Sequence, residues 1–197
     1  MKRAATLLLC GFTMTLAGLA GAATFSVTLT GPGESPPNAS PGTGTAVVSL
    51  DTVAHRLSVS VSFSGLTTPT TMSHIHCCVA PPGTAGVATT TPSFVGFPLG
   101  VTSGTFTTTL DTTQASSWNP AYITANGGTP LTAETALAAG MNAGQAYLNI
   151  HTTAFPAGEI RGFLSQLPIP TLSNWSLVLV AAFVAIAGFI AMRRRAG

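Results

Sequence analysis

Apolar and polar residues alternate in short runs along most of the chain. Successive residues of a strand point to opposite faces of a sheet, so this alternation predicts strands with one buried face. The clearest run is residues 57–63, in which leucine, valine and phenylalanine alternate with serine. The predicted strands cover residues 25–29, 46–50, 57–63, 72–79, 101–110, 147–152 and 160–164.

One segment, residues 131–141 (LTAETALAAGM), has the composition of a short helix. It is rich in alanine, and Gly140 or Gly144 suits the end of a helix. Residues 81–100 are rich in Pro, Gly and Thr and are predicted to be mostly loop. Several short strands with one helix predict an all-β fold, specifically an antiparallel, immunoglobulin-like β-sandwich.

The first 22 residues have a different pattern from the rest. A basic start, Met1-Lys2-Arg3, precedes the uncharged apolar residues 4–20, and small residues follow at Ala20-Gly21-Ala22. This order predicts a secretory signal peptide, an apolar helix over residues 1–22 that is removed after export. Cys10 would suit a lipid anchor instead, but Leu9 is bulky where such anchors need a small residue.

The other end contains a second apolar run, residues 176–192, without any charge. Such a run predicts a transmembrane helix, although ~1.5 Å per residue makes it short for a ~30 Å hydrocarbon core. Arginines at 193–195 follow, and basic clusters remain on the cytoplasmic side, so residues 193–197 are predicted to be a cytoplasmic tail. The body would then lie in the periplasm, anchored to the inner membrane. A buried core helix is disfavoured because this span has no polar face.

The charge of the body, residues 23–166, differs from that of the whole chain. The whole chain has a formal net charge of +2. The body contains no lysine. Its two arginines, Arg56 and Arg161, and its five carboxylates give it a formal net charge of −3. A body so poor in cations excludes nucleic acid as a partner.

Three of the four histidines fall in two predicted strands, at His74, His76 and His151. Residues two apart share a strand face, so His74 and His76 point the same way. If the two strands are neighbours, the three imidazoles meet on one surface. Neutral imidazole binds zinc and copper, so the pattern predicts a candidate metal site, with Glu159 as a further ligand or supporting group.

A structural interpretation of the same residues stays open. The histidines and Asn149 can equally bond loop backbone, and Glu159 can pair with Arg161 or His151. The adjacent Cys77 and Cys78 can form a disulfide in the oxidising periplasm, or stay free. Free thiolates would join the histidines at a metal or form a redox centre, whereas a disulfide would mean that the strand ends there.

Catalytic patterns are scarce elsewhere. No Gly-x-Ser-x-Gly segment occurs, and Asp111 and Glu134 lack an evident partner. Trp118 and Tyr122 form either a ligand shelf or the core of a strand-to-helix corner. We therefore expect no enzyme activity and no catalytic residue.

Residues 167–175 form a proline-containing stalk that includes Ile169-Pro170-Thr171-Leu172. Followed by the apolar run and the arginines, this segment resembles the IPTL-CTERM sorting signals of Gram-negative bacteria. The resemblance implies that an exosortase-like membrane enzyme acts at Pro170, Thr171 and Leu172 and passes the protein to the cell surface or exterior. A simple membrane anchor is the alternative.

The body resembles a CHRD domain, a module named after chordin, over about residues 29–164. The resemblance rests on Leu29-Thr30-Gly31, Glu34, Pro36-Pro37, Gly44, Gly65-Leu66, His74-Ile75-His76, Asn149-Ile150-His151-Thr152 and Gly158-Glu159-Ile160-Arg161-Gly162.

The CHRD resemblance implies a β-sandwich with a binding or structural role outside the inner membrane and an unidentified extracellular ligand. Cys77-Cys78 departs from the family pattern, which often turns through glycine at this point.

The alternative function is a zinc or copper protein built on the histidines. A third, an enzyme acting on matrix polymers, would need a deep polar cleft. Copper–zinc superoxide dismutase activity is excluded because four histidines are too few.

Overall fold

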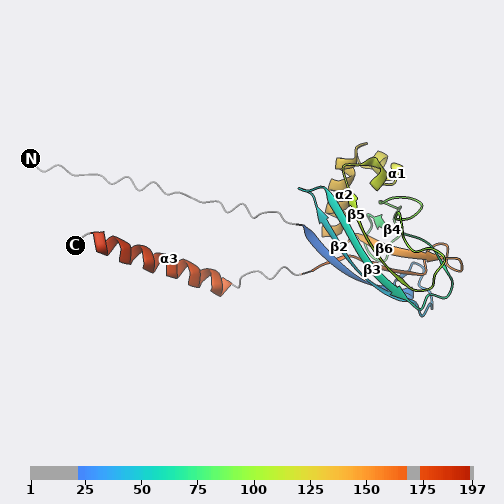
Figure 1. The fold of residues 1–197 in the computed structure, drawn as a ribbon, viewed down its shortest axis with the longest axis horizontal. Helices are drawn as coiled ribbons and strands as arrows, with labels where there is room; N and C mark the ends of the chain where they lie inside the picture. Colours follow the sequence, from blue (N-terminus) through green and yellow to red (C-terminus); the bar gives the residue numbers. More distant parts are fainter. Residues whose placement is uncertain (1–21, 168–173, 196–197) are drawn as a thin grey trace, which may run out of the picture. The chain divides into compact units, whose positions relative to one another are not determined.

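The computed structural model describes residues 22–167 and 174–195, in two units that divide between Gln166 and Leu167. The predicted signal peptide, apart from its last residue, lies outside the described residues. The same holds for Pro170, Thr171 and Leu172 of the predicted sorting motif. Figure 1 shows the first unit as a β-sheet with short helices at one end.

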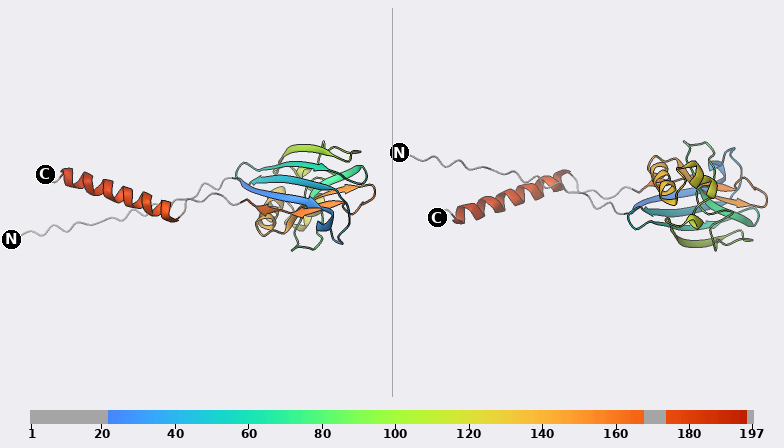
Figure 2. Two further views of the ribbon diagram at one scale, coloured as in Figure 1. Left: turned by 90° about the horizontal axis from the view of Figure 1, so that it is seen from below. Right: turned by 90° about the horizontal axis from the view of Figure 1, so that it is seen from above.

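The strands of the first unit form one antiparallel sheet in the order β4-β6-β7-β1-β2-β3-β5, and β8 pairs with β1. Their bounds are β1 Ala23–Thr30, β2 Thr43–Asp51, β3 Arg56–Ser64, β4 Thr70–Cys77, β5 Gly104–Asp111, β6 Ala146–Thr152, β7 Ile160–Phe163 and β8 Ser165–Gln166. The views in Figure 2 show β1, β2 and β3 running side by side along this unit. Every predicted strand is therefore present, with bounds that shift by a few residues.

The sheet curls into a half-barrel. Its outer strand β4 is joined to the segment just before β5, the other outer strand: the Thr70 N–H donates to the Val101 carbonyl (2.8 Å) and the Gly100 N–H donates to the Thr70 carbonyl (2.9 Å). The structure thus has one curled sheet in place of the two packed sheets that the sequence predicted. Alternation determines which residues are buried, but a curled sheet and a sandwich bury the same residues.

Two α-helices and two 3₁₀ turns complete this unit: α1 Pro120–Ala125, α2 Pro130–Asn142, η1 Gly31–Gly33 and η2 Ala115–Ser117. Helix α2 confirms the predicted helix. Thr129 caps its start through a reciprocal pair of bonds with Thr132, and Pro130 occupies the first turn. Helix α1, which the sequence analysis missed, begins after Asn119, whose side chain accepts the Ala121 N–H.

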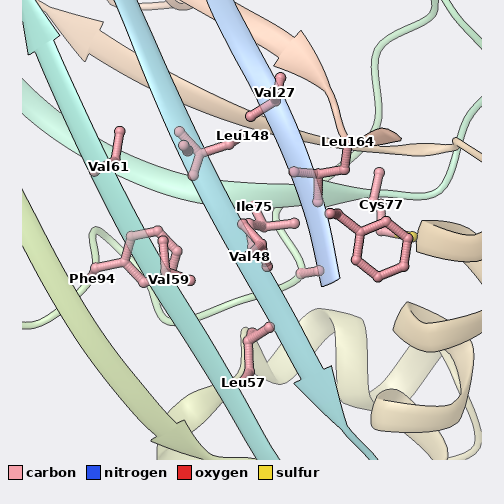
Figure 3. Packing of buried hydrophobic residues seen from close by; sticks show 14 of the residues in the cluster. Val27, Val48, Leu57, Val59, Val61, Ile75, Cys77, Phe94, Leu148 and Leu164 are labelled. Atoms are coloured by element: carbon pink, nitrogen blue, oxygen red, sulfur yellow. The ribbon is translucent and has the colours of Figure 1, made fainter. Parts of the chain in front are cut away.

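The concave face of the sheet holds the apolar core, part of which Figure 3 shows. Ile75 of β4 and Leu148 and Ile150 of β6 are fully buried in it, as their positions in the alternation predict. Leu137 and Met141 of α2 cover the same core from one end. Burying each such side chain contributes ~1.5–3 kcal/mol, so this face determines which way β4 and β6 present their other residues.

Strand β6 is buried at all of its positions, so its second face is covered as well. The free edge of β4 is lined by the long connection that follows it. Within that connection, the Ala88 N–H donates to the Ile75 carbonyl (2.9 Å) and the Phe94 N–H to the Ser73 carbonyl (3.0 Å). Loops therefore enclose the polar face of β4 and β6.

The second unit contains helix α3 (Asn174–Arg195), which covers the predicted span 176–192. Its side chains are described at residues 181–184, 186, 188 and 190–194. Within the described parts of the chain, no helix meets the length and hydropathy needed to cross a bilayer. The predicted transmembrane helix is therefore not confirmed.

Candidate metal centre

The register of β4 and β6 brings the three predicted histidines together. His74 lies opposite Asn149, and His76 lies opposite Tyr147, on the face that also carries His151. One ring nitrogen from each of His74, His76 and His151 lies within 4.8 Å of the others. The Nε2 atoms of His74 and His151 are 3.0 Å apart.

The three histidines are buried, although the sequence analysis placed them on a surface. Their exposed fractions are 2%, 7% and 5% for His74, His76 and His151. Loops cover this face, and each loop supplies one backbone carbonyl to one Nδ1 atom. The pairs are His74 with Pro92 (3.2 Å), His76 with Ala85 (2.8 Å) and His151 with Pro156 (2.9 Å).

These carbonyls determine where the histidine protons are. A carbonyl oxygen only accepts, so each Nδ1 carries the ring hydrogen and donates it. Each neutral ring then has an unprotonated Nε2 with a free lone pair. The His76 Nε2 is buried without a hydrogen-bond partner. The unprotonated Nε2 atoms of His74 and His151 therefore face each other, and the His76 Nε2 is buried in the same cluster of rings.

Protonation of the cluster is disfavoured. Burial, together with the charges that His76 and His151 would carry, lowers the pKa of His74 to about 3. Burial also lowers the pKa of His76 to about 4, although its bond to the Ala85 carbonyl opposes the shift. Burial lowers the pKa of His151 in the same way. Because lone pairs 3.0 Å apart repel, the arrangement suits a metal cation.

Glu159 lies outside this cluster. It is fully buried, and its carboxylate accepts hydrogen bonds from the Ser40 hydroxyl (2.6 Å), the Thr67 N–H (2.7 Å) and the Thr152 hydroxyl (2.5 Å). Burial raises its pKa, but these bonds outweigh that effect and hold the pKa below its usual range. The structure therefore supports neither the predicted metal-ligand role of Glu159 nor its pairing with Arg161 or His151.

Arg161 supports the cluster from the side. It is almost fully buried, and its guanidinium lies 4.7 Å from the centre of the Tyr147 ring. That ring in turn stacks on His76 at 4.6 Å and 6°. The guanidinium donates to the carbonyls of Gly33 (2.7 Å), Pro82 (2.8 Å) and Gly83 (3.1 Å). A buried arginine with these partners fixes the loops over the site.

Glu34 is the carboxylate nearest to Arg161, at 3.7 Å. Burial raises the pKa of Glu34 to about 7, and the Arg161 charge opposes this shift. The Glu34 Oε1 and Asn149 Oδ1 atoms both lack a hydrogen-bond partner and both approach Gly158. Gly158 has a φ of +132°, and a Cβ there would overlap both side chains, which accounts for the glycine. The sequence analysis did not predict that Glu34 lies beside Arg161 and Asn149, because no motif spacing joins residues so far apart in the chain.

Cys77 and Cys78 are joined as a vicinal disulfide, one of the two predicted states. Strand β4 ends at Cys77, so Cys78 leaves the histidine face and turns toward helix α2. A Cβ at Gly140 of that helix would overlap both sulfurs. The disulfide therefore packs against α2, and neither sulfur joins the histidine cluster.

The remaining candidates have structural roles. Glu134 is buried, and its carboxylate contacts the fourth histidine, His55 (3.1 Å), and the Thr112 hydroxyl. Trp118 and Tyr122 are buried and stacked, with 6.1 Å between ring centres, as the core interpretation predicted. These residues connect the helices to the sheet and are not members of the histidine cluster.

Comparison with known proteins agrees with the sequence resemblance. The model of the CHRD domain matches residues 25–164. The model of the IPTL-CTERM motif matches residues 168–194. No curated protein and no solved structure matches the chain. The C-terminal motif is a sorting signal and points to export and surface sorting. The chain therefore belongs to the CHRD-domain family and carries an IPTL-CTERM motif at its C-terminal end.

Proposed function

We propose that this protein is an exported, surface-sorted CHRD module that holds one zinc or copper ion between His74, His76 and His151. One observation carries the proposal: a ring nitrogen from each of three buried histidines lies within 4.8 Å of the others, while every Nδ1 is bonded to a backbone carbonyl. Metal-binding histidines in proteins typically have their second nitrogen fixed in this way.

The donor set selects the class of metal. Imidazole nitrogen suits zinc and copper, whereas calcium and magnesium require oxygen ligands. The cluster of ligating groups in the described residues contains histidine alone, without a carboxylate or thiolate. Zinc lies ~2.0–2.1 Å from histidine nitrogen, so the His74 and His151 Nε2 atoms, 3.0 Å apart, are close enough to share one ion.

The location of the site favours a structural role for the ion. A metal there would connect β4 to β6 directly. Through the three Nδ1 hydrogen bonds it would also fix the loops that supply Ala85, Pro92 and Pro156. An ion that binds only the folded chain raises stability by mass action. A module that works outside the cell would gain resistance to unfolding.

In this proposal, export and sorting carry the module beyond the inner membrane. The matched motif covers Pro170, Thr171 and Leu172, where an exosortase-like enzyme would act. In this proposal that enzyme processes the chain at these residues and transfers the body to the surface. An extracellular ligand then meets the body. The low content of arginine and lysine in the body supports a partner other than nucleic acid.

Metal analysis of the exported protein tests the proposal. We expect about one equivalent of zinc or copper per chain, lost in the His74→Ala and His151→Ala variants. His55→Ala is the matched control, because His55 lies outside the cluster and should leave the metal content unchanged. A metal-free native protein, or equal metal in all variants, would contradict the proposal.

A further inference from the structure

The Cys77–Cys78 disulfide lies at the wall of a solvent pocket. The pocket has a volume of about 370 Å³ and is lined by both cysteines together with residues of α1, among them Tyr122. The two cysteines differ in access: Cys77 is 5% exposed, whereas Cys78 is exposed. A reagent that enters the pocket therefore meets Cys78 first.

We propose that this disulfide is a thiol-exchange site, attacked at Cys78 by dithiols, and that its reduction weakens metal binding at His76. The second half of this inference rests on the proposed metal site, whereas the first half does not. Disulfides that are accessible to solvent are the ones that thiols reduce most readily in folded proteins.

The exchange proceeds in two steps. A thiolate of the dithiol attacks the Cys78 sulfur, the Cys77–Cys78 bond breaks, and Cys77 leaves as a thiolate that takes up a proton. The second thiol of the reagent then attacks the reagent sulfur that is bonded to Cys78. This breaks the mixed disulfide and releases Cys78 as a thiolate. Two electrons pass from the dithiol to the protein, and the reagent is oxidised to a cyclic disulfide.

Tyr122 is placed to assist the release of Cys78. Its hydroxyl oxygen lies 3.7 Å from the Cys78 sulfur. Burial raises the pKa of Tyr122 to about 12, so the hydroxyl keeps its proton at neutral pH and can donate it to a thiolate. The pocket therefore supplies both access to the disulfide and a hydrogen-bond donor for the released sulfur.

A short loop, residues 79–86, joins the disulfide to the histidines. The loop leaves the disulfide where the Val79 N–H donates to the Gln145 carbonyl (3.0 Å), and returns where the Cys77 N–H donates to the Gly86 carbonyl (3.2 Å). Within it, the Ala85 carbonyl accepts from the His76 Nδ1 at 2.8 Å. The disulfide thus constrains the base of the loop that orients His76.

The same loop holds Arg161 through the carbonyls of Pro82 (2.8 Å) and Gly83 (3.1 Å). Arg161 lies over Tyr147, which stacks on His76. Loop 79–86 therefore orients His76 by a hydrogen bond and supports it through a stack of side chains. Opening the disulfide would loosen both contacts at once.

The test has two measurements on the exported protein. First, the folded protein is treated with dithiothreitol and then with an alkylating reagent. Intact-mass measurement and peptide mapping then report the extent of alkylation at Cys77 and at Cys78. Second, zinc affinity is measured by competition with a chromophoric chelator in three samples. These are the oxidised protein, the reduced protein after removal of dithiothreitol under nitrogen, and the Cys77→Ser/Cys78→Ser variant, which has no thiol of its own to bind zinc.

We expect reduction without unfolding, faster alkylation at Cys78 than at Cys77, and zinc affinity at least about tenfold weaker in both opened forms. A disulfide that resists dithiothreitol until the protein unfolds would overturn the exchange site. Equal zinc affinity in the oxidised protein and in the Cys77→Ser/Cys78→Ser variant would overturn the coupling. If the oxidised protein binds neither zinc nor copper, the metal site and the coupling fail together, while the reduction and alkylation results still decide the exchange site.

Discussion

The Nε2 atoms of His74 and His151 lie 3.0 Å apart, although the carbonyls of Pro92 and Pro156 hold the ring hydrogens on the opposite nitrogens. Two lone pairs at this distance are stable only with a proton or a metal ion between them. Burial disfavours the proton, because it lowers the pKa of both rings. This relationship is the basis for the proposed metal centre.

Metal affinity should change little between pH 7.5 and pH 5.5. Ordinary histidines, with a pKa near 6.5, must lose protons to bind a metal below that pH. The pKa values of His74 and His76 are lowered to about 3 and about 4, and burial lowers the pKa of His151 as well, so protons compete little for these two rings in this range. Competition titrations with zinc at both pH values check this. A fall of a hundredfold or more at pH 5.5 would show that the rings titrate as exposed histidines do.

The metal-free protein should lose stability as the pH falls from 6.5 toward 4. Unfolded His74 and His76 take up protons near pH 6.5, whereas in the folded protein their pKa values are about 3 and about 4, and the pKa of His151 is lowered in the same direction. The contribution of these histidines to folding is therefore complete above pH 6.5 and is lost as the pH falls. Each histidine contributes up to about 1.4 kcal/mol per pH unit in this window. Urea unfolding across the range measures the slope.

Glu34 acts in the opposite direction. Its pKa is raised from 4.5 to about 7, so its contribution to stability is full below pH 4.5 and is lost as the pH rises through 7. We expect Glu34→Gln to be more stable than the native protein at pH 8, and to differ little at pH 4.5. Three histidines outweigh one carboxyl, so the native protein should still lose stability below pH 6.5. A flat profile in the metal-free protein would contradict the histidine assignment, and equal stability of Glu34→Gln and the native protein at pH 8 would contradict the Glu34 assignment.

Replacing Arg161 should destabilise the fold strongly. Arg161→Met removes donors from three loop carbonyls and leaves Glu34 without its cation. Breaking a buried pair by removing one partner costs ~3–5 kcal/mol. Urea denaturation should show a loss of this size. Adding Glu34→Gln to Arg161→Met should recover part of it, and strictly additive losses would show that the two side chains do not interact.

Alternation predicted the strands because each strand has one face in the core, as Ile75 and Leu148 show. It also placed His74 and His76 together, since strand parity is a local property. The alternation of apolar and polar residues did not predict where the loops lie. The burial of the histidines, the Arg161–Glu34 pair and the bonds of Glu159 all depend on contacts between distant segments, which a single sequence does not specify. The curled sheet was missed for the same reason.

Processing at the C-terminal motif should shorten the mature protein. The matched motif covers residues 168–194, and an enzyme acting at Pro170, Thr171 and Leu172 would remove Trp175 and the residues after it. Mass spectrometry of the cell-surface form should therefore find no peptide from 175–197. A replacement such as Pro170→Ala should retain the unprocessed chain in the inner membrane. An intact tail on the surface form would contradict the proposed processing.

X-ray absorption at the metal edge of the exported protein tests the central claim most directly. The account predicts one zinc or copper ion with three imidazole nitrogens at about 2.0–2.1 Å, and loss of that signature in the His74→Ala variant. A protein without metal, or an absorption spectrum that is unchanged when His74 is replaced, would contradict it.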